Sequence, residues 1–218
     1  MNNRISSREY NALMTNEKIT FVIPGYKHNP RHKAYKAISK ILKTEGYFPI
    51  LANIPWKGTT ISENTQYFLE KYQESMLLRN KAVKKSKTYV LGFSYGAMIA
   101  FLISTKLRVS GLILCSLSPY FKEDLRKFTR KDIALLTPRR YEDFSHLHSA
   151  TLAKQTKAKH ILMLYGEKEA KPLINRVKMT YRNFQSKSKY LISINNTEHT
   201  IGSKPYLQEI HHAAKILH

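Results

Sequence analysis

Short apolar runs alternate with longer stretches of helical periodicity along the chain, from Lys18 to the C-terminus. The runs are rich in β-branched and aromatic residues, which favours strands. They lie at residues 19–23, 48–53, 89–93, 111–116, 160–165 and 190–194. Strands that alternate with helices are typical of a parallel sheet covered by helices. The pattern predicts an α/β protein with a mostly parallel six-stranded sheet.

Helix start signals occur between the predicted strands. Asn29-Pro30 offers an N-cap and a first-turn proline. Thr60 and Glu63 have the spacing of a capping box. The predicted helices cover residues 31–44, 60 to about 85, 95–106, 172–184 and 205–217.

The connection between the fourth and fifth strands, residues 117–159, is far longer than an α/β connection needs. Ser118-Pro119 and Thr137-Pro138 are typical of helix starts. We therefore expect a helical excursion over one edge of the sheet, placed where a lid would lie.

Length and composition agree with one globular domain. The 218 residues suit a single core, and 42% hydrophobic with 24% charged residues excludes wholesale disorder. We assign residues 1–218 to one domain that begins with a polar segment, residues 1–17.

Residues 88–105 carry no charge and approach the length of a membrane span. Their β-branched start, central glycines and helix-forming end predict strand, turn and helix instead. The N-terminus has no apolar core of signal-peptide length, and the single cysteine, Cys115, cannot form an internal disulfide. We expect a cytoplasmic protein without a transmembrane segment, in which Cys115 is a buried thiol.

The pentapeptide Gly92-Phe93-Ser94-Tyr95-Gly96 has the pattern G-x-S-x-G at the predicted junction of a strand and a helix. A strand that turns into a helix within a few residues strains its apex residue and leaves no room for flanking side chains. The pattern predicts that the Ser94 hydroxyl is exposed as a nucleophile.

A serine hydroxyl needs a base to become a nucleophile at neutral pH. His199 falls in the loop after the last predicted strand, at the same sheet edge as Ser94. His28, after the first strand, is the main rival. We expect His199 to be the base.

The base in turn needs a carboxylate that orients it. Glu167 and Glu169 follow the fifth predicted strand, and Asp124 beyond the fourth strand is the next candidate. Glu169 lies three residues past Gly166, far enough round the turn to face the histidine loop. We favour Glu169.

Together these features resemble those of small α/β-hydrolase fold proteins. The resemblance covers the chain from Lys18 to the end and rests on four segments: the turn at 23–26, the elbow at 92–96, the acid turn at 166–169 and the His199 loop. Three departures are a missing first hairpin, Pro24-Gly25 in place of the more usual His-Gly, and Glu in place of the commoner Asp.

The resemblance implies a serine hydrolase that cleaves an ester or thioester through an acyl-enzyme, without a cofactor or metal. It assigns the two oxyanion-hole donors to the backbone N–H groups of Tyr26 and Tyr95. The expected substrate is a small or lipid-like acyl ester. Trp56, Tyr120 and Phe121 follow predicted strands and are candidate walls of an acyl pocket, with ordinary packing as the alternative.

Positive charge dominates the composition, with 37 Lys and Arg against 15 Asp and Glu and a net charge of +22. The excess is diffuse; its densest stretches are residues 81–87 and 122–140. No nucleic-acid-binding signature accompanies it, so no specific nucleic-acid partner is expected. The alternative function is a catalytically inactive hydrolase-fold module that binds an anionic partner, RNA or a membrane surface. The retained serine, histidine and acid argue against it.

Overall fold

The computed structural model describes residues 17–80, 86–134 and 136–217. Its centre is a six-stranded sheet in the order β2-β1-β3-β4-β5-β6, and every neighbouring pair is parallel. The strands are β1 (Glu17–Ile23), β2 (Tyr47–Leu51), β3 (Ser86–Phe93), β4 (Gly111–Cys115), β5 (His160–Gly166) and β6 (Ser188–Ile194). The predicted fold class is confirmed.

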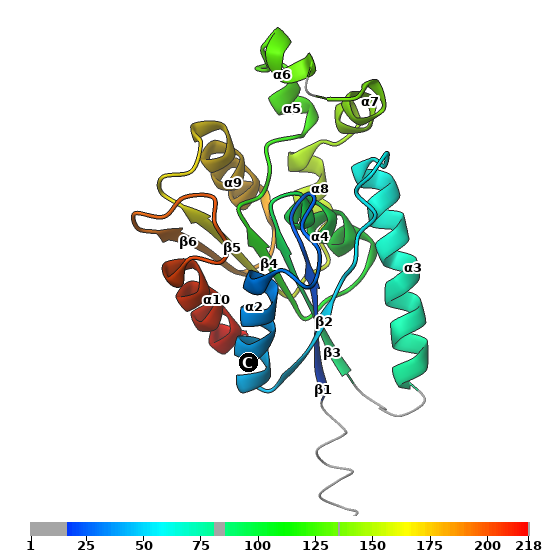
Figure 1. Cartoon of the computed structure of the whole chain (residues 1–218), viewed down its shortest axis with the longest axis vertical. Coiled ribbons are helices and arrows are strands. Elements are labelled where there is room, and N and C mark those ends of the chain that lie inside the picture. The colour runs from blue at the N-terminus through cyan, green and yellow to red at the C-terminus, as the bar shows by residue number, and fades with distance from the viewer. Residues whose placement is uncertain (1–16, 81–85, 135, 218) are drawn as a thin grey trace, which may run out of the picture.

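Two layers of helix cover the sheet (Figure 1). Leu42 of α2 (Lys33–Thr44) and Ile210 of α10 (Lys204–Ile216) belong to the hydrophobic cluster on one face. The cluster on the other face is completed by α3 (Ile61–Asn80), α4 (Tyr95–Lys106) and α9 (Lys171–Asn183). Because both faces are covered, the central strands are nearly continuous apolar runs.

The structure confirms one of the predicted helix-capping motifs and corrects another. Thr60 and Glu63 form the predicted capping box, since each side chain accepts the backbone N–H of the other residue, at 3.2 and 2.9 Å. The predicted start at residue 31 is wrong: α2 begins at Lys33 with His32 as its N-cap. Asn29 instead accepts the Arg31 N–H in the preceding turn. The predicted end of the second helix near residue 85 lies outside the described residues, as does most of the basic stretch 81–87.

The excursion at 117–159 is helical, as expected. Its described residues form α5 (Lys122–Leu125), α6 (Arg130–Ala134), α7 (Pro138–Ser145) and α8 (Ser149–Gln155). Figure 1 shows α5, α6 and α7 beyond the carboxyl ends of the strands. Thr137 caps α7 as predicted, but Ser118-Pro119 starts no helix.

A buried ion pair joins the excursion to α9. The Arg176 guanidinium, 1% exposed, donates from Nε and Nη2 to the two Asp124 carboxylate oxygens at 2.8 and 2.6 Å. It also donates to the Ser149 hydroxyl and lies over the Phe121 ring. Removing one partner of such a pair costs about 3–5 kcal/mol, because a charge is left buried without compensation. The pair therefore fixes α5 against α9.

Cys115 ends the central strand β4 and is fully buried, as expected. Burial raises the pKa of its thiol far above the usual range. Its backbone carbonyl accepts the Ser94 N–H at 2.9 Å, so the end of β4 lies directly beside the turn that carries the serine. In the described ranges, no helix has the length and apolar composition that crossing a membrane requires.

Candidate active site

Ser94 occupies the turn between β3 and α4 in a strained backbone conformation, with φ 57° and ψ −118°. A Cβ on Gly92 would lie 2.2 Å from the Gly96 carbonyl oxygen. A Cβ on Gly96 would lie 2.3 Å from the carbonyl oxygens of Ile23 and Pro24. Both glycines of the pentapeptide are therefore required by close backbone approach, as the sequence pattern predicts.

His199 reaches Ser94 from the loop that follows β6. Its Nε2 lies 3.1 Å from the Ser94 Oγ, within hydrogen-bond distance. The Phe93 ring stacks on the imidazole with centroids 4.7 Å apart. The ring is thus held with one nitrogen at the serine hydroxyl.

His28, the rival base, is bonded elsewhere. Its Nδ1 lies 2.9 Å from the Tyr35 hydroxyl, which also accepts the Gly25 N–H at 2.8 Å. Burial lowers the pKa of His28, and the nearby imidazoles of His32 and His199 lower it further. His28 therefore holds the loop after β1 rather than contacting the serine.

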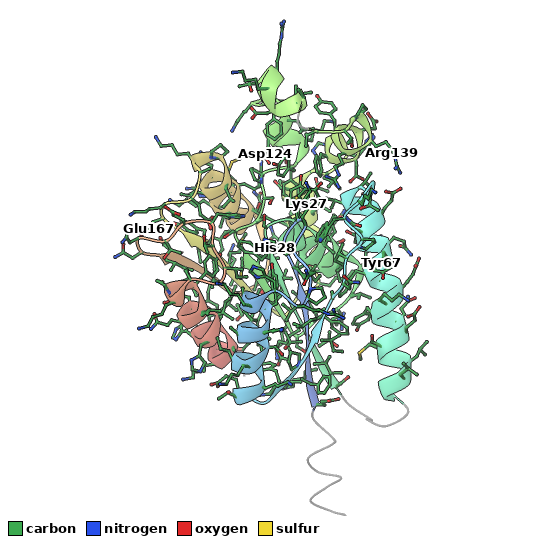
Figure 2. The ribbon with its side chains drawn as sticks, in the orientation of Figure 1. Lys27, His28, Tyr67, Asp124, Arg139 and Glu167 are labelled. Atoms are coloured by element: carbon green, nitrogen blue, oxygen red, sulfur yellow. The ribbon has the colours of Figure 1, made fainter. Side chains whose placement is uncertain are left out.

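The three candidate carboxylates have different neighbours. Glu169 has a fully buried side chain, and its Oε1 lies 3.5 Å from the His199 Nδ1. Glu167 is exposed and accepts from the Ser193 hydroxyl, and Figure 2 shows it at the outer rim of the molecule near β6. Asp124 is engaged by Arg176. Glu169 is thus the one of the three that faces the histidine, at a distance that typically shortens when substrate binds.

Direct backbone contact places Glu169 beside the histidine loop. The Lys168 N–H donates to the Thr197 carbonyl at 2.9 Å. A Cβ on Gly166 would lie 2.2 Å from the same carbonyl oxygen. Only glycine at this position lets the acid turn and the histidine loop approach so closely.

Two hydroxyls beneath Glu169 were not found from the sequence. Ser116, with φ 52°, follows β4, and its hydroxyl donates to the Glu169 Oε1. Its single proton is used there, so it accepts from the Tyr206 hydroxyl at 2.6 Å. Burial raises the pKa of Tyr206, which keeps this donor protonated. The position of Ser116 at a strand end is a usable sequence signal; Tyr206, inside α10, offers none.

A second serine lies beside the nucleophile candidate. The Ser118 Oγ is 3.0 Å from the Ser94 Oγ, and Ser118 is 3% exposed. Ser118 extends into the site instead of capping a helix, which corrects its sequence interpretation.

Tyr26 and Tyr95, the expected oxyanion-hole residues, lie together with ring centroids 5.1 Å apart. Tyr95 is the first residue of α4, so its N–H has no acceptor within the helix. Tyr26 follows Gly25, where a Cβ would meet the Phe93 ring at 2.9 Å. The loop after β1 therefore lies against the elbow.

Arg140 of α7 holds this loop in a way the sequence did not reveal. Its guanidinium donates to the Tyr26 hydroxyl at 2.7 Å, to the Trp56 carbonyl at 2.8 Å and to the Thr59 carbonyl at 2.9 Å. Its Cζ also lies 4.6 Å from the centre of the Tyr26 ring. The excursion thus contacts the loop that carries one expected oxyanion donor.

A pocket of about 790 Å³ opens beside Ser94 and His199. Tyr120 lines it, together with apolar side chains from the excursion and α9 such as Phe128, Leu136 and Met179. Trp56 instead lines a neighbouring pocket of about 510 Å³. Phe121 is fully buried in the core, so the expectation that it forms a pocket wall is not met.

Metal ligands do not gather in the described part of the chain: no three His, Cys, Asp or Glu side chains there could hold an ion together. His146, the residue that follows α7, is exposed and contacts Glu142 at 2.9 Å.

No protein-family model matches the sequence, and the search of curated proteins finds no similar sequence. Solved structures do resemble it. Est1E from Butyrivibrio proteoclasticus, solved with ferulic acid bound, superposes with a TM-score of 0.74 at 14% identity, over 91% of this chain and 87% of that one. The Paleococcus ferrophilus monoacylglycerol lipase gives 0.69 at 14% identity, over 93% and 96%.

The Pyrococcus furiosus esterase Pf2001 gives a TM-score of 0.69 at 16% identity, over 93% of this chain and 82% of that one. At sequence identities of 14–16%, the structural similarity shows the fold alone. The similarity extends over more than nine-tenths of the chain and includes the parallel sheet with its flanking helices. The chain therefore has the α/β-hydrolase fold.

Proposed function

We propose that this protein is a serine hydrolase that cleaves a carboxylic ester or thioester. The observation that carries the proposal is the line of contacts from Glu169 through His199 to Ser94, which ends on a strained turn beside a pocket. Nucleophile, base and orienting acid lie in the relation that acyl transfer requires.

In the proposed reaction the Ser94 Oγ attacks the substrate carbonyl carbon while the His199 Nε2 accepts the hydroxyl proton. The buried Glu169 carboxylate stabilises the imidazolium that forms. The backbone N–H groups of Tyr26 and Tyr95 donate to the oxyanion of the tetrahedral intermediate. Collapse of the intermediate breaks the bond to the leaving group, which takes the proton from His199, and water then releases the acyl group by the same steps.

The pocket beside Ser94 supports the proposed substrate class. Its apolar side chains suit an acyl chain or an aromatic acid, since apolar surface is what such groups bury. Esterases and a monoacylglycerol lipase among the structurally similar proteins support the same class. We infer that the substrate is a small or lipid-like ester, bound between the elbow and the 117–159 excursion. In this proposal the excursion belongs to the same domain as the rest of the chain.

A fluorophosphonate probe tests the proposal, because it labels an activated serine without knowledge of the substrate. We expect one label per chain, at Ser94, and loss of both labelling and ester hydrolysis in Ser94→Ala. Ser118→Ala is the matched control, because it removes the neighbouring hydroxyl and leaves the proposed triad, and it should still be labelled. Unlabelled wild-type protein, or an active Ser94→Ala variant, would contradict the mechanism and favour a binding module for an anionic partner.

A further inference from the structure

The neighbouring pocket of about 510 Å³ is cationic. Its lining includes Lys27, Lys57 and Arg140, together with the rings of Tyr26 and Trp56. No Asp or Glu lines it among the described residues. Three positive charges from three separate segments thus surround one space.

This cationic pocket adjoins the pocket beside Ser94. Tyr26, Lys27 and Arg140 line both. The two spaces therefore meet at these three residues. A molecule with its carbonyl at Ser94 would have to extend past them to reach Lys57.

The Arg140 charge is held in place, the Lys27 and Lys57 side chains are exposed, and the three charges are not neutralised locally. Arg140 is fixed by three hydrogen bonds to a hydroxyl and two carbonyls, none of them anionic. In the described ranges, neither Lys27 nor Lys57 forms an ion pair with a carboxylate. The nearby Glu63 is bonded to Arg139 and Thr60.

Lys27 is also held in a rare backbone conformation, with φ 61°. A non-glycine residue stays there only when its surroundings enforce it, and such residues cluster at ligand sites. Figure 2 shows Lys27 between the body of the sheet and the excursion that carries Arg139.

We propose that the cationic pocket binds an anionic oxygen group, a carboxylate or a phosphate, at the end of the substrate remote from the scissile ester. The inference rests on the proposed hydrolase function and narrows its substrates to esters that carry a negative charge. Lysine ammonium groups and a fixed guanidinium attract such a group.

Direct binding can be measured without hydrolysis, because Trp56 is the only tryptophan in the chain and lines the cationic pocket. Ser94→Ala protein is titrated with monoethyl adipate, hexyl phosphate and the neutral diethyl adipate, followed by tryptophan fluorescence. We expect saturable changes with one or both anions, and the two arms tell carboxylate from phosphate. Binding should weaken about fivefold when Lys57→Gln is added, and salt at about 0.5 M should weaken it too.

Lys40→Gln is the charge-matched control. Lys40 is exposed on α2 and lines neither pocket, but its substitution lowers the net charge by the same amount. Anion binding should be unchanged in this variant. An equal loss with Lys40→Gln and Lys57→Gln would mean that only the overall charge acts, and would overturn the proposal.

Turnover provides the second measurement. Mono-para-nitrophenyl adipate is compared with para-nitrophenyl hexanoate, which has a methyl in place of the carboxylate, and each rate is divided by its hydroxide-catalysed rate. We expect kcat/KM to favour the charged ester about tenfold, and Lys27→Gln and Lys57→Gln each to lower that ratio about threefold to fivefold. A ratio at or below one, or one that these variants leave unchanged, would overturn the proposal.

The two proposals fail in different ways. If fluorophosphonate labelling fails but the anions still quench or enhance Trp56, the anion site stands and the hydrolase function does not. If Ser94 is labelled and the neutral ester is preferred, the hydrolase stands and the anion site is wrong.

Discussion

The two sides of the site are held by different means. On one side, Ser94, Glu169 and His199 follow β3, β5 and β6, and the acid turn contacts the histidine loop through backbone atoms. On the other side, the Tyr26 loop is held by the Arg140 side chain, 114 residues away in the sequence. The first side depends on the sheet, and the second depends on side-chain contacts with the excursion and with Tyr35 of α2.

This difference separates the proposed chemistry from the proposed substrate binding. Parallel strands bring their carboxyl ends to one edge whatever the excursion does, so the triad geometry belongs to the fold. The pockets instead take much of their lining from the excursion. Changes in the excursion should therefore alter substrate preference before they abolish the reactivity of Ser94.

The largest effect is expected on the sheet side. Glu169→Gln removes the charge that we propose stabilises the imidazolium, and it should lower kcat about 10⁴-fold. Glu167→Gln is the matched control, since Glu167 is exposed and bonded to Ser193, and it should retain nearly full activity. Both are measured as kcat on a small neutral ester, with folding checked by thermal melting.

The reverse pattern would assign the acid to Glu167. Two active variants would show that the orienting carboxylate lies elsewhere. The sheet side would then supply only the serine and the histidine of the proposed triad.

A smaller effect is expected on the excursion side. Arg140→Met keeps the side-chain bulk but removes all three hydrogen bonds to the Tyr26 loop and its surroundings. If the loop carries an oxyanion donor, kcat on a small neutral ester should fall about 10- to 100-fold, more than KM rises. Arg139→Met is the control, because the Arg139 side chain is 66% exposed and bonds Glu63 and Gly58 but not the Tyr26 loop.

A change in KM alone for Arg140→Met would show that the excursion shapes binding but does not position the oxyanion donor. That result would mean that the excursion affects substrate binding alone. A drop in kcat would instead mean that the excursion also contributes to the proposed chemistry, through the Tyr26 loop.

Ser118 lies where the two sides touch, with its hydroxyl at Ser94. Ser118→Ala removes one hydrogen bond to the nucleophile and leaves His199 in place. We expect kcat to fall about two- to tenfold, as for the loss of one neutral hydrogen bond. A loss as large as that of Ser94→Ala would make Ser118 an essential part of the catalytic group.

The smallest effect concerns the stability of the Tyr26 side. Because the pKa of His28 is lowered in the native state, the unfolded chain binds a proton more readily as pH falls below about 6.5, and stability is lost in that range. His28→Asn keeps an acceptor for Tyr35 without this titration. Its Tm should fall less than that of the wild type between about pH 7.5 and about pH 5.5; equal declines would contradict the assignment.

What the sequence revealed follows the same division. The elbow, the acid turn and the histidine loop are short segments at strand ends, so local patterns were enough to predict that Ser94, Glu169 and His199 would lie close together, which the structure shows. Arg140 and Tyr206 reach their partners across long sequence separations, and no local pattern encodes such contacts. The same holds for Phe121, whose aromatic character could not show whether it faces the pocket or the core.

Local capping signals also competed with one another. Asn29 satisfies a turn and leaves His32 to cap α2. Ser118-Pro119 has the composition of a helix start, but the Ser118 hydroxyl instead contacts the Ser94 hydroxyl. At Asn29 a local turn replaced the predicted cap, whereas at Ser118 a tertiary contact with Ser94 did.

The buried Cys115 thiol makes local opening of the protein measurable by chemical modification. The Cys115 thiol is fully buried, has a raised pKa and belongs to the hydrophobic cluster that α2 and α10 form with the sheet, so it reacts with an alkylating reagent only in molecules in which this helix layer has opened. Tyr206 of α10, in the same cluster, bonds the Ser116 hydroxyl that donates to Glu169. The rate of thiol modification in native buffer therefore reports how often the layer that supports Glu169 leaves the sheet.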